Sequence, residues 1–81
     1  MEQIHFNAFP NPTQDIIQLN FGTSLEEVSI DVFNTLGGRV WSNQYNNAHT
    51  LEVDLSDFSR GIYFISVKSE SGIGEVRVVK Q

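Results

Sequence analysis

The 81-residue sequence contains no cysteine, so disulfide bonds cannot hold its fold together. It has only two histidines, which argues against a structural metal site of the kind that stabilises other small folds. Five Lys and Arg residues stand singly against ten acidic residues, and the net charge is −5. This balance lacks the basic patch by which proteins bind nucleic acid or anionic lipid. No apolar run approaches the length of a membrane-spanning helix, and residues 1–3 do not begin a signal peptide.

The length allows one small domain, residues 1–81, and no second core. A chain of this size buries only about 60–65% of its unfolded surface. Its stability is therefore expected to depend on the packing of a single core.

Apolar residues recur at every second position, a pattern that predicts half-buried β-strands. No segment keeps a helical period over ten residues. The predicted strands lie at residues 4–8, 17–21, 28–32, 40–43, 51–55, 63–67 and 75–81. Short strands at this spacing, with turn residues between them, predict an all-β fold: a small antiparallel seven-stranded β-sandwich.

Two turns have identifiable chemistry. In Phe9-Pro10-Asn11-Pro12, each residue before a proline is pushed out of the α region, and neither proline has an N–H, so the first strand must stop pairing there. The Asn11 side chain is expected to cap this corner. At Leu36-Gly37-Gly38 we expect a positive φ and a glycine-containing bulge, which would let Val32 and Val40 both face inward.

A leucine followed by Gly-x-Tyr is typical of the tyrosine corner of immunoglobulin-like sandwiches. Here the residues are Leu55 and Gly61-Ile62-Tyr63. In such a corner the tyrosine hydroxyl donates a hydrogen bond to the backbone a few residues upstream. We therefore expect an immunoglobulin-like sandwich and a structural role for Tyr63.

No group of residues forms a pattern for catalysis or metal binding. His5 and His49 are far apart in the sequence and alternate outward, so we interpret them as surface residues. The serines lack a histidine in a motif that would activate them, and the carboxylate pairs suit a solvated face. These groups are Ser56, Ser59, Asp54 with Asp57, and Glu26 with Glu27. The sequence predicts no enzyme, no metal and no cofactor.

Seven apolar residues break the alternation and fall on the outward side of their strands: Phe9, Ile16, Phe33, Trp41, Ile62, Phe64 and Val79. Either the ends and edges of the sandwich bury them, or they form an exposed patch that marks a partner surface. The last strand offers a second mode of binding, because a strand at a sheet edge can pair with a receptor strand. The charges of Glu75, Arg77 and Lys80 would then deter promiscuous pairing.

Four sequence elements stand in an order that resembles a known family. They are Pro10-Asn11-Pro12-Thr13, Val32-Phe33-Asn34-Thr35-Leu36-Gly37, Leu55-Ser56 with Gly61-Ile62-Tyr63, and Arg77-Val78-Val79-Lys80-Gln81. In this order they resemble the C-terminal sorting domain of type IX secretion substrates (Por secretion, type A) from Bacteroidota-type bacteria. The resemblance runs from Phe6 to Gln81. One departure is Gly38, where the family usually has Arg or Lys and where this chain has Arg39 one place later.

The resemblance implies a non-catalytic secretion signal. Such a domain follows a fused upstream cargo and directs it from the periplasm through the outer-membrane translocon, with the aid of a shuttle protein. A sortase-like peptidase then usually cuts just before the domain, near or before Met1 here, during surface attachment or release. The expected location is the periplasm in transit, then the cell surface or the extracellular space.

The resemblance also implies roles for individual residues. Translocon recognition is expected of Arg77, Val78, Val79, Lys80 and Gln81. A structural role is expected of Pro10, Asn11, Pro12, Gly37, Leu55, Gly61 and Tyr63. Exposed strand edges would also allow a strand-mediated homodimer. The alternative, from another class, is an immunoglobulin-like binding or adhesion module for carbohydrate, in which Trp41, Tyr45 and Phe33 stack on sugar rings.

Overall fold

The computed structural model describes residues 3–81, which form five strands and no helix. The strands are β1 (Asn7–Phe9), β2 (Ile16–Phe33), β3 (Arg39–Asp54), β4 (Gly61–Ser69) and β5 (Gly72–Lys80). All pairings between them are antiparallel: β1 with β2, β2 with β3 and β4, and β4 with β5. The prediction of an all-β antiparallel fold is therefore confirmed. Among the described residues no helix is long and apolar enough to cross a membrane.

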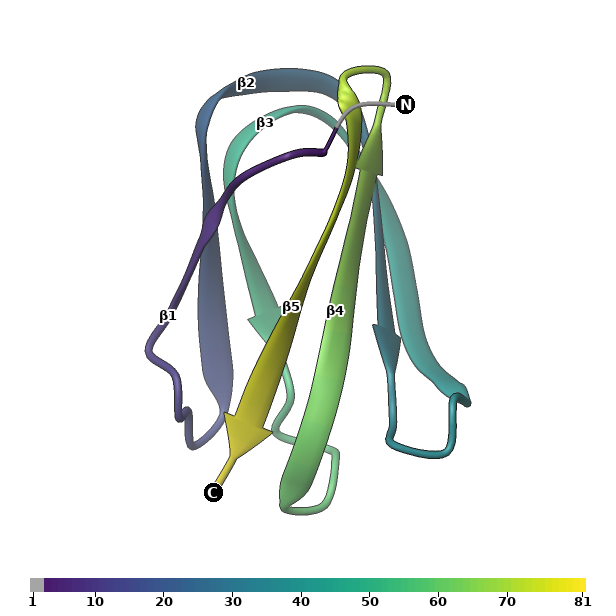
Figure 1. The fold of residues 1–81 in the computed structure, drawn as a ribbon. Coiled ribbons are helices and arrows are strands. Elements are labelled where there is room, and N and C mark those ends of the chain that lie inside the picture. Colours follow the sequence, from purple (N-terminus) through teal and green to yellow (C-terminus); the bar gives the residue numbers. More distant parts are fainter. Residues whose placement is uncertain (1–2) are drawn as a thin grey trace.

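The predicted number of seven strands is wrong, because two pairs of predicted strands are continuous. β2 contains the segments 17–21 and 28–32, and β3 contains 40–43 and most of 51–55. Both strands bend without ending (Figure 1). At the bend the β2–β3 register shifts between Asn20 and Leu25, Gly22 has φ 74°, and Asn47 has φ 55°. A period-two pattern does not show whether a strand ends or bends at a bulge.

Because β2 and β3 bend, each contributes to two layers. In the first layer, the beginning of β2 pairs with β1 on one side and with the end of β3 on the other. In the second layer, the strand order is β3, β2, β4, β5. To this layer β3 contributes its beginning and β2 its end. The sandwich is thus one sheet folded over on itself.

The core lies between the two layers and follows the predicted alternation. Its side chains with no exposed surface are Ile17, Leu19, Ile30, Val32, Val53, Leu55, Ile65, Val67 and Val78. Each such burial contributes about 1.5–3 kcal/mol before the entropy cost of ordering the chain is subtracted. Val78 is the last of them in the sequence, so a complete core requires β5.

The β2–β3 hairpin contains the expected positive φ, but its bulge lies at Val40 and not at a glycine. Gly37 has φ 86°, and the Asn34 side-chain oxygen accepts hydrogen bonds from the N–H groups of Leu36 and Gly38 at 3.0 and 2.9 Å. Val32 lies opposite Trp41, so Val40 is the extra residue of the bulge. The prediction that Val40 faces inward is wrong: it is 37% exposed, because the bulge places Trp41 on the core side instead.

The first strand is shorter than predicted, since β1 covers only residues 7–9. It ends at Phe9, immediately before Pro10, as expected from the missing proline N–H. Both bonds preceding Pro10 and Pro12 are cis. Ile4, predicted to lie in the strand, instead donates its N–H to the Ile73 carbonyl of β5 at 2.7 Å.

Candidate recognition site at the closing strand

β5 pairs along its whole length with β4, from Gly72 opposite Ser69 to Lys80 opposite Gly61. Side chains alternate along it, so the residues predicted for recognition divide between two faces. Val78 and Lys80 point inward and are 0% and 8% exposed. Arg77 and Gln81 are exposed and Val79 is half-buried. Only these last three residues present their side chains to a partner.

Lys80 caps a corner of the fold. Its ammonium donates hydrogen bonds to the carbonyls of Phe58 and Ser56, the latter at 3.4 Å. The neighbouring carbonyl of Ser59 accepts the hydroxyl of Tyr63 at 2.6 Å, which is the hydrogen bond that a tyrosine corner predicts. The chain turn between β3 and β4 is therefore fastened by one side chain from each of β4 and β5.

The same corner holds an ionised carboxylate. The Ser56 N–H donates to Asp54 Oδ1 at 2.9 Å. Hydrogen bonds from the Ser56 hydroxyl, then from its backbone N–H, and a smaller contribution from the Lys80 charge keep the pKa of Asp54 below its usual value. Asp54 is thus a charged surface group of the corner rather than an acid with a raised pKa.

The outer edge of β5 is covered at both ends by the beginning of the chain. The Asn11 side chain donates Nδ2 to the Arg77 carbonyl at 2.9 Å and accepts the Val79 N–H at 3.1 Å. Thr13 donates its N–H to the Val79 carbonyl at 2.9 Å and accepts the Gln81 N–H at 2.8 Å. With Ile4 bound to Ile73, these residues form what we call the N-terminal clamp: Ile4, Asn11 and Thr13.

The clamp changes the expected role of Asn11. The side-chain amide supplies one donor and one acceptor to β5, as the backbone of a neighbouring strand would. The outer edge between Arg77 and Gln81 is therefore already paired. A receptor strand cannot add there without displacing Asn11 and Thr13.

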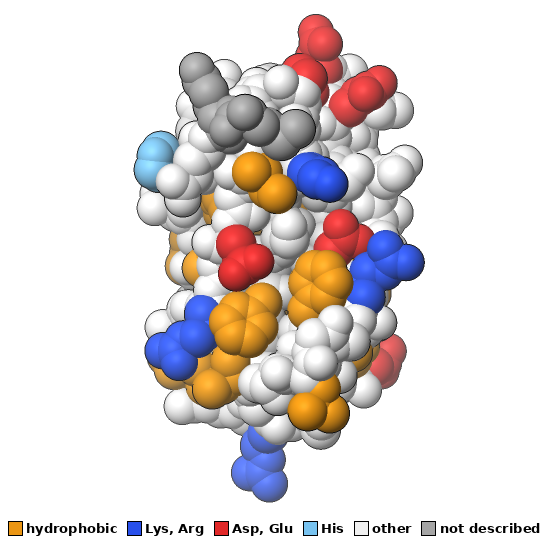
Figure 2. Space-filling view, turned by 45° about the vertical axis from the view of Figure 1, so that its right-hand side comes forward, with side chains coloured by type: hydrophobic (Ala, Val, Ile, Leu, Met, Phe, Trp, Pro, Cys, Tyr) orange, Lys and Arg blue, Asp and Glu red, His pale blue; other side chains and the backbone are white. Residues whose placement is uncertain are grey.

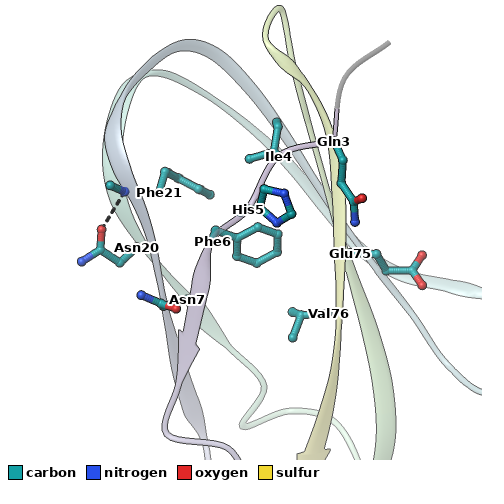
Figure 3. A pocket seen from close by; sticks show the side chains of 10 residues that line it. Gln3, Ile4, His5, Phe6, Asn7, Asn20, Phe21, Glu75 and Val76 are labelled. Atoms are coloured by element: carbon teal, nitrogen blue, oxygen red, sulfur yellow. Dashed lines mark hydrogen bonds between the residues drawn. The ribbon is translucent and has the colours of Figure 1, made fainter.

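An opening of about 560 Å³ remains between the two ends of the clamp, where β1 turns away from β5 to pair with β2 (Figure 3). Phe6 and Phe21 lie against each other in it, with ring centroids 6.0 Å apart. Its titratable side chains are His5 and Glu75. Within residues 3–81, no group of three or more His, Cys, Asp or Glu side chains is placed to hold a metal ion.

The outward apolar residues divide between the layers. Phe33 lies directly opposite Phe64, and Ile62 opposite Val79, on the outer face of the second layer. We call these four residues the phenylalanine patch. The sequence identified each of them as outward but did not place them together, because the pairing of β2 with β4 is a long-range contact. Phe9 and Ile16 belong to the first layer.

The three aromatic residues considered for sugar stacking do not share a face. Trp41 and Tyr45 lie opposite the buried Val32 and Val28 and pack against the core. Phe33 follows Val32 in the strand and therefore points to the outer face. The arrangement gives no stacking platform built from all three.

Comparisons with known proteins agree with this geometry. A family model described as "Secretion system C-terminal sorting domain" matches residues 7–81. No match was found among curated proteins. The fold is similar to the crystal structure of a DUF3244 family protein with an immunoglobulin-like β-sandwich fold from Bacteroides vulgatus ATCC 8482. The TM-score is 0.77 at 12% identity, over 94% of this chain and 84% of that one. At this identity the likeness shows the immunoglobulin-like sandwich alone.

Proposed function

Because the chain belongs to the family of type IX secretion C-terminal sorting domains, we propose that it carries a fused upstream cargo from the periplasm across the outer membrane. The match over residues 7–81 is the observation that carries this proposal. Substrates of this system are exported to the cell surface or the extracellular space. Residues 1–81 would form one such domain of a longer secreted protein.

We propose that the domain is a signal and not a catalyst. Its partners would be the outer-membrane translocon, a shuttle protein and a sortase-like peptidase that cuts upstream of β1. A cut before Ile4 would leave the N-terminal clamp and the paired edge of β5 intact. Recognition would use the outward side chains Arg77, Val79 and Gln81, while Val78 and Lys80 hold the strand in place.

The test is transport of a reporter. The chain is fused to the C-terminus of a reporter that bears a signal peptide, and the fusion is expressed in a bacterium with a working type IX system. We expect the fusion at the cell surface or in the medium, and the reporter without the chain in the periplasm. In a strain that lacks the translocon, the fusion should also stay in the periplasm. Periplasmic retention of a folded fusion in the competent strain would contradict the proposal.

A further inference from the structure

The outer face of the second layer carries a row of four side chains in direct cross-strand register. Arg39 of β3 lies opposite Phe33 of β2, Phe33 opposite Phe64 of β4, and Phe64 opposite Arg77 of β5. Neighbouring strands are about 4.8 Å apart, so the row is roughly 15 Å wide. Ile62 and Val79 lie on one side of it and Asp31 and Glu75 on the other. Figure 2 shows hydrophobic side chains on one face, with acidic side chains among them and basic side chains at both flanks.

Within the described residues, no further layer covers this face. Phe33 and Phe64 belong to the two inner strands of the layer, so no sheet edge covers them, and both side chains are half-buried. Aromatic side chains opposite each other on a sheet stabilise the pairing by only about 0.2–1 kcal/mol. Single exposed apolar residues are ordinary, but adjacent ones with a polar rim are typical of a binding surface.

The charges on this face differ from those of the whole chain. Arg39, Lys68 and Arg77 point outward here beside the acidic residues Asp31, Glu75 and Glu27, whereas the whole chain has five basic and ten acidic residues. Arg39 and Asp31 contact each other only loosely, at 3.5 Å, and the Arg39 side chain is 62% exposed. The rim therefore offers guanidinium groups to a partner, although acidic residues outnumber basic ones in the whole chain.

We propose that this face is the docking surface by which a protein of the outer-membrane secretion machinery recognises the domain. The inference rests on the proposed function and extends it: the partner would bind the outward side chains of β5 together with Phe33 and Phe64. The partner would present an apolar side chain over the two phenyl rings and carboxylates toward Arg39 and Arg77. Aromatic residues and arginine are the residues that most often dominate the binding energy of protein interfaces. A second copy of this chain fits less well, because it would bring a further net charge of −5.

The test replaces the two phenyl rings in the reporter fusion. Phe33→Thr with Phe64→Thr removes the rings and keeps a β-branched residue suited to strands. Phe9→Thr with Ile16→Thr is the matched control, because both residues are 45% exposed and belong to the first layer. We expect the patch variant to lower the exported fraction by about tenfold or more, the scale of a hot-spot residue, and the control to export like the parent. Circular dichroism melting of each purified variant shows whether it folds.

A charge variant keeps the proposal testable if the phenylalanine variant does not fold. Arg39→Glu with Arg77→Glu should lower export to a similar extent, and Arg60→Glu, in the turn before β4, should not. Normal export of the folded phenylalanine variant and of the folded arginine variant would overturn the docking surface. Translocon-dependent export of the parent would still leave the proposed function intact. Failure of the parent itself to be exported would remove the proposed function. A concentration-dependent dimer that is lost in Phe33→Thr with Phe64→Thr, measured by light scattering, would overturn the assignment to a secretion protein.

Discussion

Lys80 shows how a charged residue becomes part of the interior. The stem of the side chain is buried, and its ammonium meets two carbonyls of the β3–β4 turn. Burying an ammonium group without such partners would be costly, and leaving the carbonyls unpaired would be costly as well. Lys80 and its corner are therefore coupled, and the residue contributes to the fold whether or not a partner also reads it.

Replacing Lys80 by methionine should destabilise the chain. Lys80→Met keeps the apolar stem but removes both hydrogen bonds, and we expect a loss of about 1.5–3 kcal/mol, the usual worth of a bond to a charged group. Chemical denaturation measures the free energy of unfolding. Lys68→Met, an exposed lysine on β4, is the matched control and should change it by less than about 0.5 kcal/mol. Equal effects of the two substitutions would show that Lys80 has no capping role.

Tyr63 gives a smaller but cleaner prediction. Tyr63→Phe removes only the hydroxyl that donates to Ser59, and stability should fall by about 1 kcal/mol. The thermal melting midpoint measures this loss of stability. Tyr45→Phe is the control, since the Tyr45 hydroxyl contacts only the exposed Asn43 amide, at 3.2 Å. An unchanged midpoint in Tyr63→Phe would refute the tyrosine corner as a stabilising contact.

The burial of a single side chain could be predicted from the sequence where its cause lies within the same strand. The period of two located the buried side chains of Ile17, Ile30 and Ile65, because alternation is a property of the strand itself. The same alternation puts Lys80 on the face of Val78, but its hydrogen-bond partners were not predictable, because these carbonyls belong to a turn more than twenty residues earlier.

At the level of elements, β5 is held by hydrogen bonds on both edges. One edge has the regular ladder with β4, and the other has the N-terminal clamp. The clamp includes a side chain, Asn11, that behaves as a piece of strand. Edge strands in many sheets are exposed to adventitious pairing, and covering the edge is one way to prevent it.

Asn11→Ala should loosen the end of β5. The Val79 N–H and the Arg77 carbonyl both lose their partner, so we expect a loss of about 1–2 kcal/mol, from two hydrogen bonds. Hydrogen exchange of the Val79 amide should become faster. Asn7→Ala, an exposed asparagine on β1, is the control and should leave that exchange rate unchanged. Unaltered exchange in Asn11→Ala would contradict the clamp.

The number of strands and the phenylalanine patch could not be predicted from the period-two pattern of apolar residues. The sequence located most strand residues but divided β2 and β3 in two, because Gly22 and Asn47 look like turn residues and instead form bends. It also identified Phe33 and Phe64 as outward. Their meeting on one face depends on the register of β2 with β4, which no local signal contains.

For the whole molecule, the last five residues are structural as well as accessible. Residues 77–81 include the buried Val78, the capping Lys80 and the three clamp partners Arg77, Val79 and Gln81. Their removal exposes core and leaves polar groups unpaired in several places. The summed cost is comparable with the 5–15 kcal/mol that stabilises a typical domain.

A chain without residues 77–81 should therefore fail to fold. We expect no cooperative thermal transition by circular dichroism, whereas deletion of Gln81 alone, which removes one clamp hydrogen bond, should leave a transition at a lower temperature. A cooperative transition close to that of the parent would show that β4 can close the sandwich unaided. If deletion of residues 77–81 unfolds the chain, a transport defect in that variant reports loss of folding and not loss of recognition. The phenylalanine variant then remains the test of recognition.

The place of β5 in the core has a consequence for the order of synthesis. β5 is the last of the five strands to leave the ribosome, and without it the second layer lacks Val78 and the clamp has nothing to hold. A polypeptide whose translation stops before this strand, or whose end is clipped by a protease, cannot display the ordered row from Arg39 to Arg77. Under the docking proposal, export would then be open only to chains that include β5, and products that lack it would be retained without a separate checkpoint.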